Sequence, residues 1–492
     1  MNYGLGIADM LIIIAYALVL MGMGIYFYGK SKTSEQFMLA GRSIPAWAAG
    51  LAVMSTYTSS VSYIAVPGKA FDDNWHPLIF ALTALPVAWF VTKFVIPHYR
   101  KHQIISVYSY LEEKIGGWGR AYAAFSFLLF MVGRVAVILY LSALLLTSFL
   151  NEDIGTVILI VGMVTILYTL MGGMEAVIWT DVIQSTVMIG GVLFVAYVLS
   201  AEVFAQPEYL IQNAWDQDKF SLGDTHFSLS GRTIWVMIIY GITENVRNLI
   251  ADQNYTQKYS TVATEKEAKK SVWIAMLIYL PLTAIFLYIG TALFSFYGGE
   301  GHLLNEAITK GDEVFPFFIS AELPVGIKGL MVAAIMAASM STVDSALNSS
   351  ATVLYIDFYQ KYFNPNASGK TSLKFLRLAT VIWGLLGIGF ALLMISAKSA
   401  LDVWWQISGI FGGAILGLFL MALYNVKISK LQGMLSVAFS IMIVVWGTFL
   451  RVLPEPYAWL ECTMDPIIIG AASTTGLVCL ALLFVLLNRR SK

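Results

Sequence analysis

The sequence predicts an all-α integral membrane protein with about thirteen transmembrane helices. Of its 492 residues, 58% are hydrophobic and only 12% are charged, and the mean hydropathy is +0.74. Apolar runs of about 20 residues recur along the chain, and each is long enough to cross roughly 30 Å of hydrocarbon. Because a bilayer offers the backbone no hydrogen-bond partners, each run is expected to be a helix.

The spans divide into two groups by their side chains. Nearly uninterrupted apolar character predicts helices at 8–28, 77–99, 154–172, 272–295, 376–397, 431–452 and 466–487. Apolar runs that carry polar or charged side chains predict helices at 43–67, 120–149, 177–200, 233–252, 326–356 and 403–424. The first run lacks a preceding basic segment, so we expect a retained span rather than a cleaved signal peptide. The outer loops 201–232 and 296–323 are long enough to hold short helices.

The charges alternate between successive loops. Lys and Arg gather in the loops after the first, third, seventh, ninth and eleventh spans and at the C-terminus. On this prediction Lys258 belongs to the loop after the seventh span. The other loops are acidic. The positive-inside rule then places the N-terminus outside and the C-terminus inside the cell. The net charge is zero, which gives no support for a nucleic-acid partner.

Five groups of polar residues interrupt the apolar runs. A charged side chain inside a span costs several kcal/mol and generally faces a cavity or a partner, so each group is a candidate functional site. The groups are Ser55–Gly68, Arg134 in "MVGRVAVILYL", Asp181 in "VIWTDVIQ", the segment "GITENVRNLIADQ" with Glu244, Asn245 and Arg247, and "MSTVDSALNSS" at 340–350.

One face of the predicted helix 326–356 carries a polar stripe. Its members lie at i, i+3, i+4 and i+7, with a threonine beside them: Ser341, Asp344, Ser345, Asn348 and Thr342. Single hydroxyls of this kind often bond back to their own helix or join neighbouring helices. A cluster that includes a carboxylate instead favours a hard cation, which prefers oxygen ligands. Residues 55–62, rich in hydroxyls, are expected to break their helix and expose carbonyls to a monovalent ion.

Five motifs resemble the sodium/solute symporter family, which includes sodium/glucose, sodium/proline, sodium/iodide and sodium/sialic acid transporters. They are "SEQFMLAGRSIPAWAAG", "LYTLMGGMEAVIWTDVIQ", "DQNYTQKY", "GIKGLMVAAIMAASMSTVDSALNSSATVLYIDFY" and "FGGAILGLFLMALY". The resemblance implies a leucine-transporter-like core of five plus five helices in inverted repeat, with broken helices. It implies an extra helix and loop at 1–42, repeat 1 at 43–200, an outer loop at 201–232, repeat 2 at 233–424 and two further helices at 425–492.

The resemblance also implies sodium ligands. A first Na⁺ site takes the carbonyls of Ser55, Thr58 and Ala338 and the hydroxyls of Ser341 and Thr342. Some members have a second site, which here takes Asp181, Ser341, Asp344 and Ser345. Asp344 stands where several of those members have a small neutral residue, so it could instead pair with a Lys or Arg. One and two sodium ions per cycle both remain open.

The resemblance further implies a solute site at mid-membrane. Its matching residues are Tyr57, Ser59, Ser60, Ser62, Phe71, Arg134, Asn245, Gln253 and Gln406. The guanidinium of Arg134 favours an anionic solute, and its neighbourhood resembles the sialic acid branch of the family. The alternative for Arg134 is an internal salt bridge to Glu244 or another carboxylate. Asn245, Gln406 and the serines suit a polyhydroxylated solute.

These observations predict a sodium-coupled symporter of the cell membrane that works by alternating access. The expected solute is a small polar molecule, first a sugar or sugar acid such as sialic acid, then an amino acid or small carboxylate. Na⁺, the solute and the bilayer are the expected partners. The sequence does not fix the oligomeric state, and a monomer is one of the options. The competing classes are a sensor or channel with this fold and an intramembrane enzyme that uses Asp181 and Asp344 as a carboxylate pair.

Overall fold

The computed structural model describes residues 5–490 except 103, 151, 206, 299–303, 305–307, 309, 397–399 and 453, and leaves aside the side chains of 148, 150, 202–210, 396–410 and 490. The α-helices are α1 (Ile7–Tyr28), α2 (Ser34–Leu39), α3 (Ala46–Tyr57), α4 (Ser60–Asp72), α5 (Leu78–Phe90), α6 (Ile96–Lys101), α7 (Val107–Lys114), α8 (Gly117–Leu150), α9 (Ile154–Ala205), α10 (Pro207–Asp216), α11 (Ile234–Val246), α12 (Gln253–Tyr259), α13 (Glu265–Gly298), α14 (Gly311–Ala321), α15 (Ile327–Val353), α16 (Gly369–Leu393), α17 (Ala400–Leu423), α18 (Lys430–Phe449) and α19 (Ile469–Arg490). Short 3-10 or π segments lie at Ala40–Arg42, Val91–Val95, Arg247–Ala251, Leu354–Phe363, Met394–Ser396, Glu455–Leu460 and Pro466–Ile468.

The regular secondary structure of the described part of the chain is entirely helical, with no strand. Within it, nine helices are long and apolar enough to cross a membrane, or ten if the bent pair Ser34–Arg42 and Ala46–Tyr57 forms one span. The predicted spans 43–67, 233–252 and 403–424 are not among the nine. The first is divided between α3 and α4, the second consists of α11 and the π segment Arg247–Ala251, and the third lies on α17, where Phe411–Leu423 forms a shorter apolar helix. The predicted outer loops 201–232 and 296–323 contain α10 and α14.

The two predicted spans 154–172 and 177–200 form one continuous element, α9, that turns sharply at Gly173. Gly173 has φ 61° and ψ −154°, a conformation that residues with a β-carbon avoid. A β-carbon at this position would lie 2.9 Å from the backbone of Phe37. Glycine therefore permits both the turn and the close approach of α2, and the turn aims the second half of α9, with Asp181, at the centre of the molecule.

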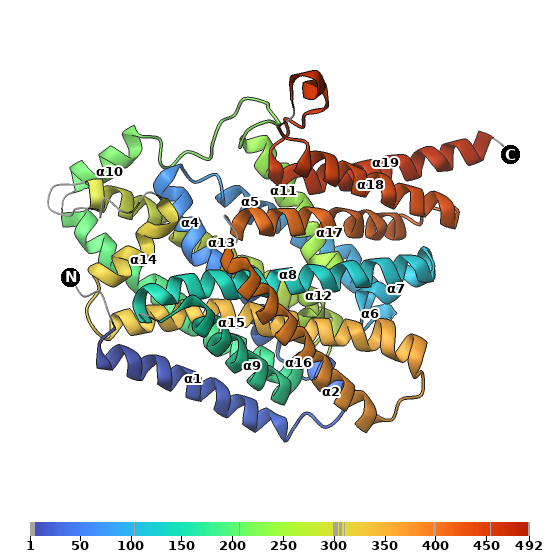
Figure 1. Cartoon of the computed structure of the whole chain (residues 1–492), viewed down its shortest axis with the longest axis horizontal. Helices are drawn as coiled ribbons and strands as arrows, with labels where there is room; N and C mark the ends of the chain where they lie inside the picture. Colours follow the sequence, from blue (N-terminus) through green and yellow to red (C-terminus); the bar gives the residue numbers. More distant parts are fainter. Residues whose placement is uncertain are drawn as a thin grey trace.

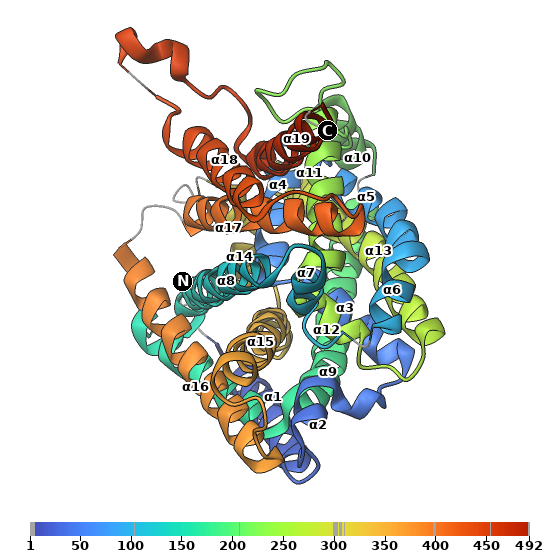
Figure 2. The ribbon, with the colours of Figure 1, turned by 90° about the vertical axis from the view of Figure 1, so that its right-hand side faces the viewer.

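Helix α15 lies in the interior of the bundle, surrounded by α1, α3, α8, α9, α12 and α16 (Figure 2). In the most apolar stretch of 18 residues of the span Ile327–Phe363, 89% of the residues are buried. The N-terminal end of α15 is held by α1, where Asp9 Oδ1 accepts hydrogen bonds from the amides of Gly326 and Gly329, each at 2.7 Å. A carboxylate at a helix N-terminus stabilises the unpaired amides and the positive end of the helix dipole.

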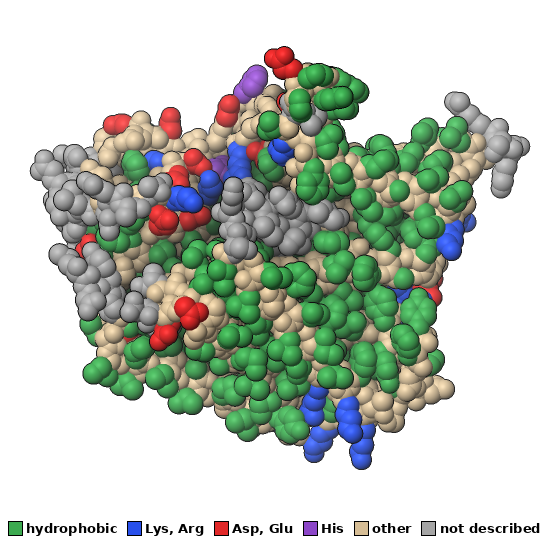
Figure 3. All heavy atoms as spheres, in the orientation of Figure 1, with side chains coloured by type: hydrophobic (Ala, Val, Ile, Leu, Met, Phe, Trp, Pro, Cys, Tyr) green, Lys and Arg blue, Asp and Glu red, His purple; other side chains and the backbone are tan. Residues whose placement is uncertain are grey.

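The surface and the ends of the chain fit a membrane-embedded bundle. Hydrophobic side chains cover the middle of the face shown in Figure 3, and charged side chains lie mostly toward its edges. The N- and C-terminal ends lie at opposite ends of the long axis (Figure 1), along which α1, α8, α15 and α19 run. Both cysteines are free thiols, Cys462 buried and Cys479 exposed.

Candidate functional site

The predicted break in the helix 43–67 is confirmed. Helix α3 ends at Tyr57, Thr58 (φ −107°, ψ 93°) and Ser59 (φ −99°, ψ 178°) are extended, and α4 begins at Ser60. The break leaves the carbonyl of Thr56 without a helical partner. That oxygen accepts hydrogen bonds from Arg134 Nη2 at 3.1 Å and from the Tyr255 hydroxyl at 3.2 Å. The break therefore brings α8 and α12 to the same point on the chain.

The hydroxyl pair of α15 converges on a single carbonyl. Ser341 Oγ and Thr342 Oγ1 donate hydrogen bonds to the oxygen of Ala338 at 3.2 and 3.1 Å, and all three residues are buried. A hydroxyl that donates its proton keeps two lone pairs for another partner. Because α15 packs against both α3 and α4, these oxygens and the unwound segment at Thr58 belong to adjoining elements.

A chain of serines connects the broken helix with α15. Ser142 on α8 donates a hydrogen bond to Ser339 at 2.6 Å and lies 3.4 Å from the hydroxyl of Ser60. All three side chains are buried. Ser60, predicted as a solute ligand, thus lies at the junction of α4, α8 and α15.

Asp181 forms a buried ion pair with Lys258. The Lys258 ammonium lies 2.8 Å from Asp181 Oδ2, and it also donates to Thr56 Oγ1 at 2.6 Å and to the carbonyl of Ala52 at 2.9 Å. Neither charged side chain is exposed. Asp181 Oδ1 has no hydrogen-bond partner among the described residues. The predicted second Na⁺ site thus has a fixed positive charge beside its carboxylate.

Counting Lys258 among the residues of a cytoplasmic loop was wrong. The chain unwinds at Asp252 (φ −101°, ψ 114°) and resumes as α12, which runs into the interior rather than out of it. The Asp252 side chain caps α12 by accepting from the amide of Asn254 at 2.9 Å. A helix that restarts after a break looks like a polar loop in the sequence, and this is why the expectation failed.

Asp344 is surrounded by hydroxyls. Its Oδ2 accepts from the Tyr168 hydroxyl at 2.9 Å and from Thr180 at 3.4 Å, and its Oδ1 accepts from Ser345 at 3.2 Å. Within the described ranges no Lys or Arg pairs with it, so the structure offers no support for the alternative of a salt bridge. Tyr168 and Thr180 both lie on α9, on either side of the turn at Gly173.

Arg134 and Arg247 are held differently. Arg247 pairs tightly with Glu244, at 2.7 and 3.0 Å, and lies 3.6 Å from Asp252. The carboxylate nearest to Arg134 is that of Asp252, at 3.9 Å. Arg134 is 7% exposed, and its guanidinium lies 5.7 Å from the centre of the Tyr255 ring. The salt bridge to Glu244 that was considered for Arg134 is therefore made by Arg247. The other form of that alternative, a pair with another carboxylate, is present as the long contact of Arg134 with Asp252.

The other predicted solute residues of this region lie at the break and along α4. The ring of Tyr57 packs against Tyr255 and Tyr279, with centroids 4.8 and 5.0 Å apart, and its hydroxyl has no partner among the described residues. Ser59 and Ser62 are half-buried at the break and on the first turn of α4, and Phe71 packs against Phe294 at the far end of α4.

The three amides predicted as solute ligands are placed less favourably. Asn245 donates to the carbonyl of Phe80 at 3.0 Å and to Thr83 at 3.2 Å, both on α5. The side-chain amide of Gln253 donates to the carbonyl of Ile105 at 2.8 Å and accepts from the backbone amide of Val107 at 3.0 Å. Gln406 lies on α17, where its side chain falls outside the described residues.

The family model of the sodium:solute symporters matches residues 37–442. The chain is a member of the sodium:solute symporter family. The sodium/sialic acid symporter of Aliivibrio fischeri is 32% identical over 444 residues, which cover 90% of this chain and 88% of the relative. That of Proteus mirabilis is 30% identical over 443 residues, 89% of each chain. The structure of a Na⁺-coupled sialic acid symporter in a substrate-bound, outward-open state matches with a TM-score of 0.89 and 28% identity, over 97% of this chain and 98% of the other.

Membership makes this symporter a multi-pass transporter of the cell membrane, with Na⁺ as the coupled ion, and not an enzyme. No group of three or more His, Cys, Asp or Glu side chains that could hold a metal occurs in the described part of the chain.

Sequence reasoning missed the roles of Lys258 and Tyr168 in the polar interior. For Lys258 the available signal was its place in "DQNYTQKY", directly after a polar interruption of an apolar run.

Proposed function

We propose that this symporter carries sialic acid or a related sugar acid into the cell together with Na⁺, by alternating access. The observation that carries the choice of solute is Arg134. It is buried beside the helix break and its nearest carboxylate is 3.9 Å away, whereas Arg247 is already neutralised by Glu244. A guanidinium without a tight ion pair is suited to bind a solute carboxylate with two parallel hydrogen bonds. The sialic acid symporters of two bacteria, at 32% and 30% identity, support the same class.

The hydroxyls around the break supply the rest of the proposed solute site. Ser59, Ser60 and Ser62 present donors and acceptors for the hydroxyl groups of a sugar, and Tyr57 offers an aromatic face and an unpartnered phenol. Phe71 lies further out along α4. Gln406 stays a proposed solute ligand. Asn245 and Gln253 also stay in the proposal, but each would have to give up its present hydrogen bonds to reach the solute.

We propose a first Na⁺ site made of the carbonyls of Ser55, Thr58 and Ala338 and the hydroxyls of Ser341 and Thr342. The broken backbone on one side and the converging hydroxyls on the other supply oxygen ligands of the kind that a hard monovalent cation prefers. Sodium bound there would hold the broken helix against α15 until the two repeats move apart. A membrane potential of 100 mV contributes about 2.3 kcal/mol per charge, or roughly fiftyfold accumulation per sodium ion.

A second Na⁺ site at Asp181, Ser341, Asp344 and Ser345 is supported by the contact of Asp344 with Thr180, the residue that directly precedes Asp181 on α9. The combined charge of Asp181 and Asp344 is −2 when both are ionised, and Lys258 offsets only one unit. A sodium ion between them would balance the other, so two sodium ions per cycle is the stoichiometry we favour. The expected alternative is one sodium ion with a neutral, protonated Asp344.

For the membrane topology we propose thirteen crossings, with repeats at 43–200 and 233–424, an outer loop at 201–232, and flanking segments at 1–42 and 425–492. The two ends of the chain lie at opposite ends of the bundle (Figure 1), as an odd number of crossings requires. The distribution of Lys and Arg puts the C-terminal end in the cytoplasm.

The solute is tested by uptake of labelled sialic acid into proteoliposomes under an inward gradient of Na⁺ or of K⁺. Accumulation should require Na⁺. Arg134→Gln should weaken the apparent affinity about thirtyfold, since hydrogen bonds to a charged group contribute about 2 kcal/mol. Arg377→Gln, on α16 with its guanidinium over the Tyr28 ring, is the matched control. Competition by proline or lactate instead of sialic acid would replace the proposed solute by an amino acid or a small carboxylate.

The sodium site is tested in the same vesicles with Ser341→Ala plus Thr342→Ala. Sodium-driven accumulation should disappear, because two of the five proposed ligands are removed. The pair Ser349→Ala plus Ser350→Ala, buried two turns further along α15, is the control and should leave the dependence on Na⁺ in place. Uptake that is insensitive to the first pair would contradict the proposed site.

A further inference from the structure

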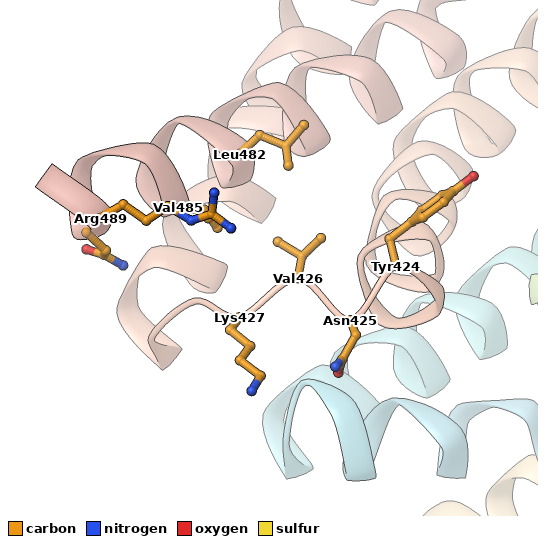
Figure 4. Close-up of a pocket in the computed structure, with 8 residues that line it drawn as sticks. Tyr424, Asn425, Val426, Lys427, Leu482, Val485 and Arg489 are labelled. Carbon is orange, nitrogen blue, oxygen red and sulfur yellow. The ribbon is translucent and has the colours of Figure 1, made fainter.

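A pocket of about 680 Å³ opens at the C-terminal end of the bundle, away from the sodium and solute sites. It lies between the loop that joins α17 to α18 and the last turns of α19 (Figure 4). Asn425 and Lys427 line it from the loop, and Leu482, Val485 and Arg489 line it from α19. The pocket exists because α17 ends at Leu423 while α19 continues to Arg490 beside it.

The side chains around this pocket carry positive charge and hydrogen-bond donors. Lys427 and Arg489 are exposed, and neither forms an ion pair with another described residue. The amide of Asn425 is also part of the lining, and the lining contains no acidic side chain. Asn488 lines the pocket too, but its amide exchanges two hydrogen bonds with Gln432, each at 3.1 Å. Asn425 has φ 51°, a left-handed conformation that Asn tolerates, and it turns the chain out of α17 into the loop. The pocket therefore suits an anion.

The wall next to these charges is apolar. Leu482 and Val485 line the pocket, and the surface of α19 beside it continues with Leu483, Leu486 and Leu487, which are 49%, 57% and 50% exposed. Directly after this apolar surface the helix reaches Asn488 and Arg489. Such a change from apolar to charged side chains marks the boundary between hydrocarbon and lipid headgroups. An occupant of the pocket thus has its anionic part at the boundary and its apolar part along α19.

We propose that this pocket binds an anionic phospholipid of the cytoplasmic leaflet. Lys427 and Arg489 contact its phosphate, the amide of Asn425 contacts its headgroup oxygens, and its acyl chains lie on Leu482 and Val485. Helix α19 lies beyond the residues that the family model matches, whereas the loop that carries Asn425 and Lys427 lies within them. The lipid would join α17 to α19 at the end where the two helices separate. The choice of leaflet rests on the orientation proposed above.

The proposal is tested on the full-length protein, purified in neutral detergent and stripped of lipid. Dioleoyl phosphatidylglycerol should raise the melting temperature and remain bound in native mass spectra, and phosphatidylcholine at the same concentration should do neither. Glycerol 3-phosphate should not compete, because it lacks the chains. Binding that does not distinguish the two lipids, or full competition by glycerol 3-phosphate, would overturn the lipid assignment, the latter in favour of a site for soluble phosphates.

The pocket itself is tested by Lys427→Gln plus Arg489→Gln, which should weaken phosphatidylglycerol binding at least tenfold. The matched control is Lys370→Gln plus Lys374→Gln, which removes the same charge from exposed positions on α16 and should keep wild-type binding. If the double variant is unstable, each single variant should show a partial loss. Unchanged binding in the variants of the pocket would refute the site. Because the readouts are lipid binding and melting rather than uptake, the outcome is independent of the proposed solute.

Discussion

Replacing Lys258 by Met would remove the positive charge that Asp181 faces in the interior. Coulomb's law over the 2.8 Å between Nζ and Oδ2, at an effective dielectric constant of about 20, gives an attraction of about 6 kcal/mol. Desolvation offsets much of this, and removing one partner of a buried pair typically costs about 3–5 kcal/mol because the other charge is left without compensation. The carbonyl of Ala52 and the hydroxyl of Thr56 lose their donor as well.

The assay is thermal unfolding of the detergent-purified protein together with sodium-driven uptake. An unfolding entropy of about 2 cal/mol/K per residue over 492 residues converts the expected loss to a melting temperature lower by about 3–5 °C. Asp181→Asn should cost a similar amount, and the double variant should cost less than the sum of the two, since it leaves no lone charge. Uptake should fall because the ammonium also holds α3 against α9.

The control is Lys266→Met, an exposed position on α13, which should melt as the wild type does. If Lys258→Met also melts as the wild type does, or if the double variant is the exact sum of the single ones, then the pair is not energetically coupled and the reasoning from burial fails. A Lys258→Met variant whose melting temperature is restored by added Na⁺ would instead show that a sodium ion can replace the ammonium beside Asp181.

Three further perturbations test the frame around the sites. Gly173→Ala should lower yield and melting temperature, because φ is positive and a β-carbon would meet the backbone of α2; Gly190→Ala, with free space around it, should not. Asp9→Ala should lower the melting temperature by about 2 °C, because the amides at the start of α15 lose a charged acceptor, and Asp9→Asn should recover part of the loss. Burial first, and then the nearby charge of Arg232, lowers the pKa of His76 to about 4 in the folded protein. Because the pKa in the unfolded chain is about 6.5, the protein should lose stability as the pH is lowered from 6.5 to 4. The variant His76→Gln should lose less melting temperature over this pH range.

The break in the helix 43–67 illustrates what a sequence can predict locally. Hydroxyls from Ser55 onward compete with the backbone for hydrogen bonds, and the structure has the break at Thr58 and Ser59. The polar face of α15 was equally predictable, because side chains three and four residues apart lie together on any helix. In both cases the interacting groups are close in the chain.

The partners of the charged groups were not predictable in this way. Arg134 was recognised as a buried cation, yet the sequence could not tell that Arg247 would take Glu244 and leave Arg134 only a distant contact with Asp252. In the sequence, Glu244 and Asp252 are both possible partners for either arginine. Packing decided between them, because it fixed which side chain was within reach of which.

The sequence by itself determined that this chain is a helical membrane protein, where one core helix breaks, and that one helix carries a stripe of polar side chains, since these follow from hydrophobic length and helical period. Only the tertiary structure decided that Lys258 and Asp181, 77 residues apart, share one buried site. The free energy of a charge in the interior depends on the groups that surround it, and folding brings those groups from distant parts of the chain.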